Sequence, residues 1–540
     1  MDAIACTNLP RGPRAGSPGT DQVWHYPANR IAALVRSGEV SALEAVEAHI
    51  ARIEEVNPKL NAVVVKRYDA ARGEAREIDR RRLAGEALPP LAGVPVTIKD
   101  SLDLAGLPST FGLPSRAQAR AEADEVHVER LRGAGAIVLG KTNVSQLLIY
   151  VEADNPLYGR TLNPWNSERT CGGSSGGEGA IIAVGGSALG LGTDIGGSVR
   201  YPATFCGIAS LKPTAGRCPD FGRFSVPLGQ REIASQVGVL ARTVEDVALG
   251  LQTIDPGYAG INGPVLPLGD MGAVDMATLR VGVYGDDGIM ASSPAVRRAV
   301  REAAAALEAA GATVVEWTPP AMPQAYYLAF AIFTADGGRL LKDVLGRDAT
   351  HKTVKTLMGL AGRSRTTLSV LAALLRAAGQ RTLAGNLAAF GNTRTVDYWR
   401  LTEQLLGYRQ RFAEAMAKAP GGPLDCILGP ACALPALPHG ATADLGPVGV
   451  NTALYNVLGY PAGVVPMTRV RAGEETVRAK SRDIVEKAAR NCELGSAGLP
   501  VGVQIAARPW EEHKALAAMR AIETTARRAA DFPDLAKLAI

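Results

Sequence analysis

A run of thirty residues, from Cys171 to Arg200, holds eleven glycines and constrains this chain more than any other segment. Glycine loses more backbone entropy on folding than other residues, so such a run is not typical of a core helix or strand. It suits a place where several backbone N–H groups converge on one point, as in an anion site or an oxyanion hole. Ser174 and Ser198 each follow a glycine pair in this run. The run therefore predicts nucleophilic chemistry, provided that a base accompanies the serines.

The composition is that of an ordinary globular protein, with 540 residues, 47% of them hydrophobic, and a formal net charge of +5. Basic residues are mixed with acidic ones and form no stripe with aromatic residues, so nucleic acid is not expected as a partner. The seven cysteines are scattered and form no C-x-x-C pair, which indicates neither a disulfide framework nor a zinc site. Reduced thiols and a cytoplasmic location are expected, with no metal.

No targeting segment or membrane span is apparent in the sequence. The first 30 residues contain four prolines and lack the apolar core of a signal peptide. Residues 1–25 are predicted to be a loose tail. The apolar runs elsewhere are too short or too rich in glycine to cross a bilayer, which leaves at most peripheral membrane contact. The charged segment 474–490 is predicted to be an exposed helical insertion or excursion.

Helical and strand-like segments alternate along the rest of the chain. Helical spacing of apolar residues predicts helices within 42–56, 69–83, 125–132 and 511–527, and a mostly helical stretch over 326–418. Short apolar runs predict buried strands at 91–98, 136–139, 279–284, 313–317, 426–428, 462–466 and 501–506. Ser293 and Pro294 mark the start of a helix between two of these strands, and Gly311 marks its end. The alternation predicts an α/β fold, a mixed sheet flanked by helices, in one large domain over residues 26–540.

Two motif matches lack the context that their chemistry needs. Residues 135–142, GAIVLGKT, fit the P-loop pattern, but the residues between the glycines are apolar and strand-like, and a helix precedes them. Residues 172–176, GGSSG, fit the pattern of a nucleophile elbow, but that turn follows a strand and 164–170 is predicted to be a polar loop. No histidine stands in a distinctive context. A nucleotide-binding protein through 135–142 stays open as a disfavoured alternative.

Lys99 is the remaining candidate for a base that activates a serine. It ends the apolar stretch 93–98, where a side chain is held rigidly at the edge of a core. A lysine acts as a base only when it is neutral, and burial lowers its pKa. The alternative is a lysine at a strand end that extends its charge to water. The residues alone leave both interpretations open.

Three motifs, in order along the chain, resemble the amidase signature family. They are Lys99 in GVPVTIKD, the serines of GGSSGG at 172–177, and Ser198 in TDIGGSVR at 193–200. The resemblance continues through GKTN at 140–143, FCG at 205–207, LKPT at 211–214, LYNVLGYPAGVVP at 454–466 and GLPVGVQ at 498–504. It spans roughly residues 30–530, with the signature core at about 90–250. It implies the amidase signature fold and an enzyme without a cofactor that hydrolyses small-molecule amides at the C–N bond.

Carried over residue by residue, the resemblance implies a Ser–Ser–Lys triad. Ser198 is then the nucleophile that forms an acyl-enzyme, and Ser174 connects it to Lys99, the base. The peptide bond between Gly173 and Ser174 corresponds to a cis linkage in the family. The backbone N–H groups of the following loop are then the oxyanion hole: Ile195, Gly196 and Gly197.

Other residues near the motifs receive supporting roles. Ser175 is either a hydrogen-bond partner near the substrate or a simple turn hydroxyl. Asp194 and Arg200 flank the nucleophile and are expected to fix the shape of the glycine loop. Cys171 and Cys206 have no neighbouring histidine and are expected to be packing residues.

Within the family, the motifs are most similar to those of fatty acid amide hydrolases, and acetamidases and aryl-acylamidases share part of them. Ile195 and Tyr201 stand where glutaminyl-tRNA amidotransferase subunits usually have threonine and glutamine. Leu148 and Ile149 fall where fatty acid amide hydrolases line their acyl channel, although core packing also explains them. The segment 366–395, which corresponds to a membrane cap, shows no obvious apolar face. A homodimer is possible, and the acyl length stays open.

Overall fold

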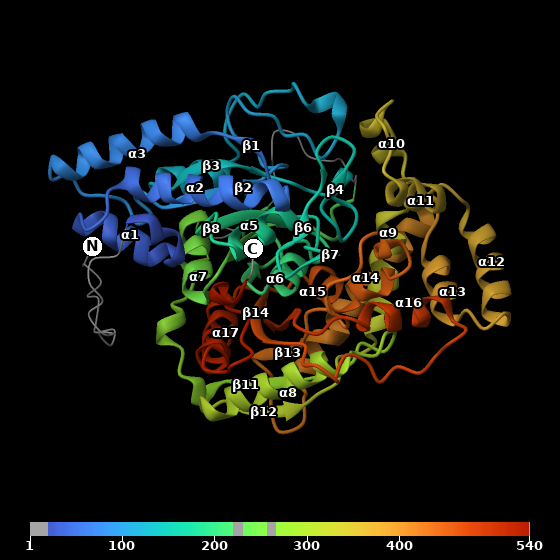
Figure 1. The fold of residues 1–540 in the computed structure, drawn as a ribbon. Coiled ribbons are helices and arrows are strands. Elements are labelled where there is room, and N and C mark those ends of the chain that lie inside the picture. Colours follow the sequence, from blue (N-terminus) through green and yellow to red (C-terminus); the bar gives the residue numbers. More distant parts are fainter. Residues whose placement is uncertain (1–19, 220–229, 256, 258–265, 539–540) are drawn as a thin grey trace.

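The computed structural model describes residues 20–219, 230–255, 257 and 266–538 (Figure 1). One eleven-stranded sheet runs through them in the order β1-β3-β2-β8-β10-β9-β14-β15-β13-β11-β12. The pairs β2–β3, β2–β8, β11–β12 and β11–β13 are parallel, and the remaining neighbours are antiparallel. The predicted α/β fold with a mixed sheet is therefore confirmed.

Seven strands of the large sheet overlap the predicted segments, whereas β1, β8, β9 and β10 were not predicted. The strands of this sheet are β1 (Val63–Lys66), β2 (Pro95–Lys99), β3 (Ile137–Thr142), β8 (Leu189–Asp194), β9 (Ala209–Lys212), β10 (Gln236–Ala241), β11 (Arg280–Val283), β12 (Thr313–Glu316), β13 (Cys426–Pro430), β14 (Ala462–Arg469) and β15 (Pro500–Ala507). Two small hairpins join β4 (Asp154–Asn155) to β5 (Gly159–Arg160) and β6 (Leu162–Asn163) to β7 (Asn166–Thr170).

The helices surround this sheet. In the first half they are α1 (Ala28–Ser37), α2 (Ala42–Leu60), α3 (Tyr68–Leu83), α4 (Val126–Gly133), α5 (Gly176–Ala183), α6 (Arg200–Cys206) and α7 (Val244–Ile254). In the second half they are α8 (Pro294–Ala309), α9 (Met322–Phe333), α10 (Arg339–Leu345), α11 (Lys352–Ala361), α12 (Arg365–Ala377), α13 (Arg381–Ala389), α14 (Thr395–Ala417), α15 (Val450–Leu458), α16 (Ile484–Glu493) and α17 (Glu512–Ala526).

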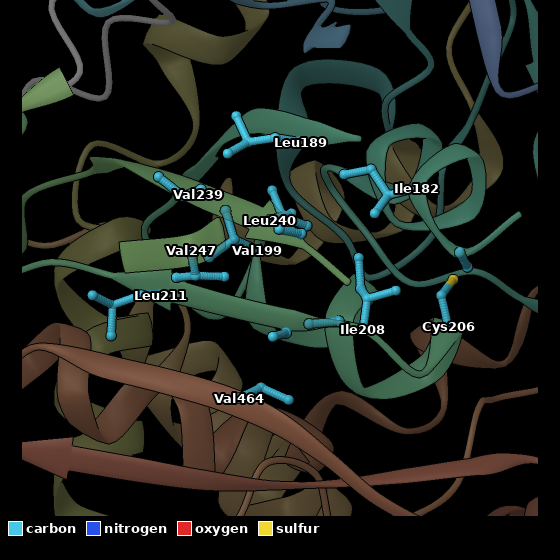
Figure 2. Packing of buried hydrophobic residues seen from close by; sticks show 14 of the residues in the cluster. Ile182, Leu189, Val199, Cys206, Ile208, Leu211, Val239, Leu240, Val247 and Val464 are labelled. Atoms are coloured by element: carbon cyan, nitrogen blue, oxygen red, sulfur yellow. The ribbon is translucent and has the colours of Figure 1, made fainter. Parts of the chain in front are cut away.

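Local signals place several of these boundaries. Ser293 accepts a hydrogen bond from the Val296 N–H and caps α8, and Pro294 occupies its first turn, as predicted. Strands β11 and β12, on either side of α8, pair in parallel. The core lies where β8, β10, β9 and β14 meet the helices, and Figure 2 shows its aliphatic side chains packed together.

The glycine-rich run is more regular than predicted, because it contains both α5 and β8, and both elements are buried. The reason is close packing. A Cβ at Gly190 would lie 1.9 Å from the Glu178 carboxylate, and one at Gly192 would lie 2.7 Å from Ser175 Oγ. Leu189, by contrast, faces α7 on the other side of the sheet, where it lies beside Gly250. The glycines therefore let α5 lie directly on β8, which compensates their entropic cost.

Other predictions are corrected. The presumed polar loop 164–170 contains the strand β7. The disfavoured P-loop interpretation of 135–142 gains no support, because most of this segment is the buried strand β3, as its apolar residues predicted. In 474–490 only the part from Ile484 on is helical, while much of the segment is exposed, as predicted, and Glu474 pairs with Arg298 at 2.6 Å.

The predictions for the N-terminal tail and for the segment 366–395 are also revised. Of the expected tail 1–25, residues 1–19 lie outside the described residues, and Thr20–His25 form a short 3-10 helix with Val23 buried. Helix α12 does carry exposed apolar side chains, since Val370, Leu371 and Leu374 are 59%, 41% and 64% exposed. Among the described residues, no helix combines the length and apolarity that crossing a membrane requires.

Candidate active site

Lys99 is the last residue of β2 and is completely buried. Strand β2 lies between β3 and β8 and is parallel to both, so its carboxyl end stands beside theirs. Alternation along the strand places Lys99 and Thr97 on the same face, the face that α5 covers. The fold therefore carries the lysine into the interior, and the alternative of a lysine extending to water is wrong.

The side chain of Lys99 ends among oxygen atoms. Its Nζ donates to Ser174 Oγ and to Thr193 Oγ1, each at 2.7 Å, and to the Thr193 carbonyl at 3.3 Å. When the amine is neutral, its lone pair can instead accept the proton of the Ser174 hydroxyl. This short contact is the geometry that a proton transfer between serine and lysine needs.

Ser174 lies in a tight turn between β7 and α5. The Gly173–Ser174 peptide bond is cis, as the resemblance implies. A Cβ at Gly173 would come within 2.5 Å of the Glu152 backbone nitrogen, and one at Gly172 within 2.7 Å of the Pro202 nitrogen. Only glycines allow the segment around Glu152 and helix α6 to approach this turn so closely.

Ser198 lies in the loop between β8 and α6. Ser198, Ile195 and Gly196 are only half-buried, although the residues around them are buried. The Ser175 N–H donates to the Ser198 carbonyl at 3.2 Å, which joins this loop to the turn of Ser174. Among the described residues, the Ser198 hydroxyl makes no hydrogen bond to Ser174 or to another group. The structure thus shows the Lys99–Ser174 link and an accessible serine in the adjacent loop.

A buried ion pair fixes the loop of Ser198. Arg200 Nη2 lies 2.9 Å from Asp194 Oδ1, and both side chains are inaccessible to solvent. Burial alone raises the pKa of Asp194, but the charge and hydrogen bonds of Arg200 hold that pKa well below its usual range. Arg200 also donates to Gln504 Oε1 at 2.7 Å and to Asn456 Oδ1 at 2.6 Å, so distant parts of the chain brace the loop.

The same pair engages one of the expected oxyanion donors. The Gly197 N–H donates to Asp194 Oδ1 at 2.8 Å and is therefore not directed at a substrate in this structure. Within the described residues, the N–H groups of Ile195 and Gly196 have no such partner. The expected set is thus reduced to these two, and the carboxylate holds the backbone that presents them.

Ser175, Cys171 and Cys206 lie close to the turn of Ser174. Ser175 Oγ donates to the Thr193 carbonyl at 3.4 Å, the same carbonyl that Lys99 contacts. Burial raises the pKa of the Cys171 thiol to about 12 and that of Cys206 well above its ordinary value. Both thiols are therefore protonated packing groups at neutral pH, as expected.

Sequence reasoning missed Glu178, a fully buried carboxyl group beside the lysine. Its Oε2 accepts from Thr97 Oγ1 at 2.7 Å and its Oε1 from Thr142 Oγ1 at 2.8 Å. Burial raises the pKa of Glu178 to about 8, against the two hydrogen bonds and the charge of Lys99, which lower it. The sequence contains a partial indication of this carboxyl group, because Glu178 stands only four residues after Ser174.

Replacing Glu178 by glutamine is expected to change how stability depends on pH. The folded state keeps the Glu178 proton up to about pH 8, whereas the unfolded chain releases it near its ordinary pKa of 4.5. Between these values the folded state binds more protons, so this group lowers stability by up to about 1.4 kcal/mol per pH unit as pH rises. Glu178→Gln removes that loss, and its stability relative to wild type should grow from pH 5 to pH 8 in urea titrations.

The matched control for this experiment is Glu152→Gln. Burial opposes ionisation of Glu152, but the nearby His439 ring and the hydrogen bonds from the Gly440 amide and the Thr442 hydroxyl hold its pKa below the ordinary value. Its stabilising contribution is complete above pH 5, so the control should lose a constant amount of stability over the same range. Parallel stability curves for Glu178→Gln and wild type would contradict the assignment of a proton to Glu178.

Leu148 and Ile149 are half-buried at the edge of a small apolar cluster. The cluster joins their loop to α10 and α11 and contains Phe111, Leu113, Leu147, Tyr150, Leu345, Val354 and Met358. The same segment reaches the serine turn, because Ala153 Cβ would lie 2.7 Å from a Cβ at Gly176. The two side chains therefore combine partial exposure with apolar surroundings, and they stand a few residues before the Ala153 that packs on the serine turn.

Residues 44–516 of this chain match the family described as Amidase. The chain is 36% identical to fatty-acid amide hydrolase 1 of Sus scrofa over 512 residues, which are 93% of this chain and 86% of that protein. It is 34% identical to fatty acid amide hydrolase 1 of Caenorhabditis elegans over 504 residues, 91% of this chain and 86% of that protein. A solved structure of a fatty acid amide hydrolase superposes with a TM-score of 0.80 and 25% identity, covering 94% of this chain and 86% of that one.

Proposed function

The chain belongs to the Amidase family and is a hydrolase of amide C–N bonds, and we propose that it cleaves amides of apolar carboxylic acids through a Ser–Ser–Lys triad. The observation that carries the proposal is the 2.7 Å contact between Lys99 Nζ and Ser174 Oγ inside the core. A buried lysine bonded to a serine is the arrangement that a lysine base requires.

In the proposed reaction, Ser198 Oγ attacks the carbonyl carbon of the amide. Its proton passes to Ser174, whose own hydroxyl proton passes to neutral Lys99. The oxygen that becomes negative is stabilised by the N–H groups of Ile195 and Gly196, and each such donor typically contributes about 2.7–4 kcal/mol. Lys99 then returns the proton through Ser174 to the leaving nitrogen as the C–N bond breaks.

The acyl-enzyme that results is released by water. A water molecule attacks the ester carbonyl while its proton moves by the same route, and Ser198 recovers its proton as the acid departs. Ser198 is half-exposed, so both substrate and water can approach it. The open hydroxyl of Ser198 in the unliganded chain is compatible with this scheme, since catalytic hydrogen bonds often close only with substrate bound.

The acyl group is proposed to lie against Leu148 and Ile149. Their half-buried side chains border an apolar cluster, and Ala153, a few residues further along the same segment, packs on the serine turn. The similarity to fatty acid amide hydrolases supports the same assignment. An apolar wall of this kind favours acyl chains over charged or strongly polar groups.

Hydrolysis of p-nitroanilides from acetyl to octanoyl tests the acyl site. Each methylene that the enzyme buries contributes about 0.8 kcal/mol, so kcat/KM should rise about fourfold per added CH2 until the site is full. Ile149→Asp should weaken octanoyl substrates far more than acetyl ones, because it places a charge on the apolar wall.

The matched control is Leu374→Asp, which changes an exposed apolar residue on α12 and should leave the profile unaltered. A flat or falling profile from acetyl to octanoyl would exclude the apolar acyl site. It would favour the alternative of an acetamidase or aryl-acylamidase with the same triad.

A further inference from the structure

The carbonyl of Gly196 lies in the loop that carries Ser198, and a helix from the far end of the sequence binds it. Helix α15 presents Thr452, which is fully buried, and Thr452 Oγ1 lies 2.8 Å from the Gly196 oxygen. This contact joins residues that are 256 positions apart. The triad and the oxyanion donors do not account for it, since neither Thr452 nor the Gly196 oxygen belongs to them.

The Thr452 hydroxyl has a single proton, and its neighbours determine where that proton points. Tyr201 Oη lies 2.6 Å from Thr452 Oγ1, and the Gly449 carbonyl oxygen lies 3.3 Å away. Burial raises the pKa of Tyr201, so its phenol keeps its proton and can donate to Thr452. A carbonyl oxygen can only accept, so the Thr452 proton goes to the Gly196 oxygen, the nearer of the two carbonyls. The result is a chain in which Tyr201 donates to Thr452 and Thr452 donates to Gly196.

The peptide unit between Gly196 and Gly197 is held at both of its polar atoms. Its carbonyl accepts from Thr452, and its N–H, which belongs to Gly197, donates to Asp194 Oδ1 at 2.8 Å. Because a peptide unit is planar, two fixed atoms on opposite sides fix the orientation of the whole unit. Glycine on each side offers no side chain to resist rotation, so the two hydrogen bonds supply the restraint.

The two glycines of this unit differ in what faces them. A Cβ at Gly197, whose φ is +122°, would lie 2.5 Å from Thr452 Oγ1 and 2.5 Å from a ring carbon of Tyr201. A Cβ at Gly196 would meet no atom of the described residues within 4 Å, apart from its chain neighbours. The loop is therefore packed against Thr452 on one side and open at Gly196, one of the two residues whose N–H groups the proposed function directs at the substrate.

Helix α15 is bound to both ends of the same loop by further hydrogen bonds. Asn456 stands four residues after Thr452, on the same face of the helix, and its Nδ2 donates to Asp194 Oδ1 at 3.0 Å. Arg200 donates to the Thr452 carbonyl at 2.8 Å. These bonds hold the helix against the loop, so the Thr452 hydroxyl meets Gly196 from a rigid support.

We propose that Thr452 is a positioning residue of the oxyanion hole, which fixes the peptide after Gly196 and thereby keeps the N–H groups of Ile195 and Gly196 directed at the substrate oxygen. The inference rests on the proposed function, since it presupposes that Ser198 attacks the amide. An oxyanion donor stabilises the transition state only while it points at the developing charge. Loss of the Thr452 hydroxyl should therefore lower kcat and leave KM nearly unchanged.

Thr452→Val removes the hydroxyl and keeps the branched shape of the side chain. For the p-nitroanilide that wild type cleaves best, we expect kcat to fall about 10- to 100-fold, with KM within about threefold of wild type. An alkylboronic acid of matching chain length is the second probe. Ser198 Oγ adds to its boron, the hydroxyl proton passes to the base, and the resulting anion places an oxygen in the hole. Its affinity should fall by the same factor as kcat, and Thr452→Ser should recover most of both losses.

Thr468→Val is the matched control, because Thr468 is an equally buried threonine on β14. Its hydroxyl donates to Asp531 at 2.9 Å instead of a residue of the site, so its loss should lower stability without a change in kcat. Tyr201→Phe removes the donor to Thr452 and should lower kcat and boronate affinity together in the wild-type background. In the Thr452→Val background it should have no further effect, because Thr452 transmits its influence. If Thr452→Val does not fold, Tyr201→Phe alone provides the test.

The outcomes separate this inference from the function on which it rests. If Ser198→Ala keeps its activity, or if wild type does not bind the boronate, the proposed function is wrong and the role of Thr452 with it. If wild type behaves as proposed, the role of Thr452 alone is overturned by any of three results. These are kcat and boronate affinity within about threefold of wild type in Thr452→Val or, where that variant does not fold, in Tyr201→Phe; a rise in KM with kcat unchanged; and no recovery in Thr452→Ser.

Discussion

Ser198→Ala is expected to abolish amide hydrolysis, with a fall in kcat of roughly 10³ to 10⁶-fold, the range seen when a nucleophile is removed from a catalytic triad. The same substitution should abolish labelling by a fluorophosphonate, which reacts with activated serines. Stability should change little, because the Ser198 side chain is half-exposed and makes no hydrogen bond within the described residues.

Mass spectrometry of the labelled protein identifies the nucleophile directly. Ser174 and Ser198 lie in one tryptic peptide, but cleavage after Glu178 places them in different peptides. A label on the fragment that contains Ser174 or Cys171 would contradict the assignment. Ser175→Ala is the control, since its hydroxyl only contacts the Thr193 carbonyl and its loss should lower kcat far less.

Seven strands of the large sheet could be predicted, because they are short apolar runs between turn residues. Cys426–Pro430 and Pro500–Ala507 differ from the predicted segments by only one or two residues at each end. The start of α8 could also be predicted, because Ser293 and Pro294 act within a single turn. Signals of this local kind require no knowledge of the rest of the chain.

The glycine-rich run could not be assigned in this way, because its structure depends on contacts that are distant in sequence. Gly190 looks unfavourable in a strand until Glu178 is seen against it. The hydrogen bond from Gly197 to Asp194 was equally hidden, since Asp194 holds its position through Arg200 and residues more than 250 positions away. The sequence motif named the residues of the site, but it did not show which backbone groups remain available.

Lys99→Ala is expected to remove most of the activity, with a loss of at least 10³-fold in kcat/KM, because Ser174 then has no base. In wild type, kcat/KM should rise with pH along a limb that reports one deprotonation of the free enzyme, since only neutral Lys99 accepts the serine proton. The limb should disappear in Lys99→Ala. Lys99→Met fills the same buried space and should lose activity to the same extent. That result would show that the loss comes from the missing amine and not from a cavity in the core.

The control for this experiment is Lys141, a second buried lysine, which lies on the neighbouring strand β3. Burial lowers the pKa of Lys141 to about 8, and its Nζ donates to the Pro108 carbonyl and Ser109 Oγ instead of a candidate catalytic serine. Its titration would produce a limb of its own near neutral pH, so Lys141→Met must be measured beside Lys99→Met. If the limb keeps its midpoint in the Lys99 variants and vanishes in Lys141→Met, Lys99 is not the base. If it vanishes only in the Lys99 variants, Lys99 is the base, because Lys141 is equally buried but does not contact Ser174.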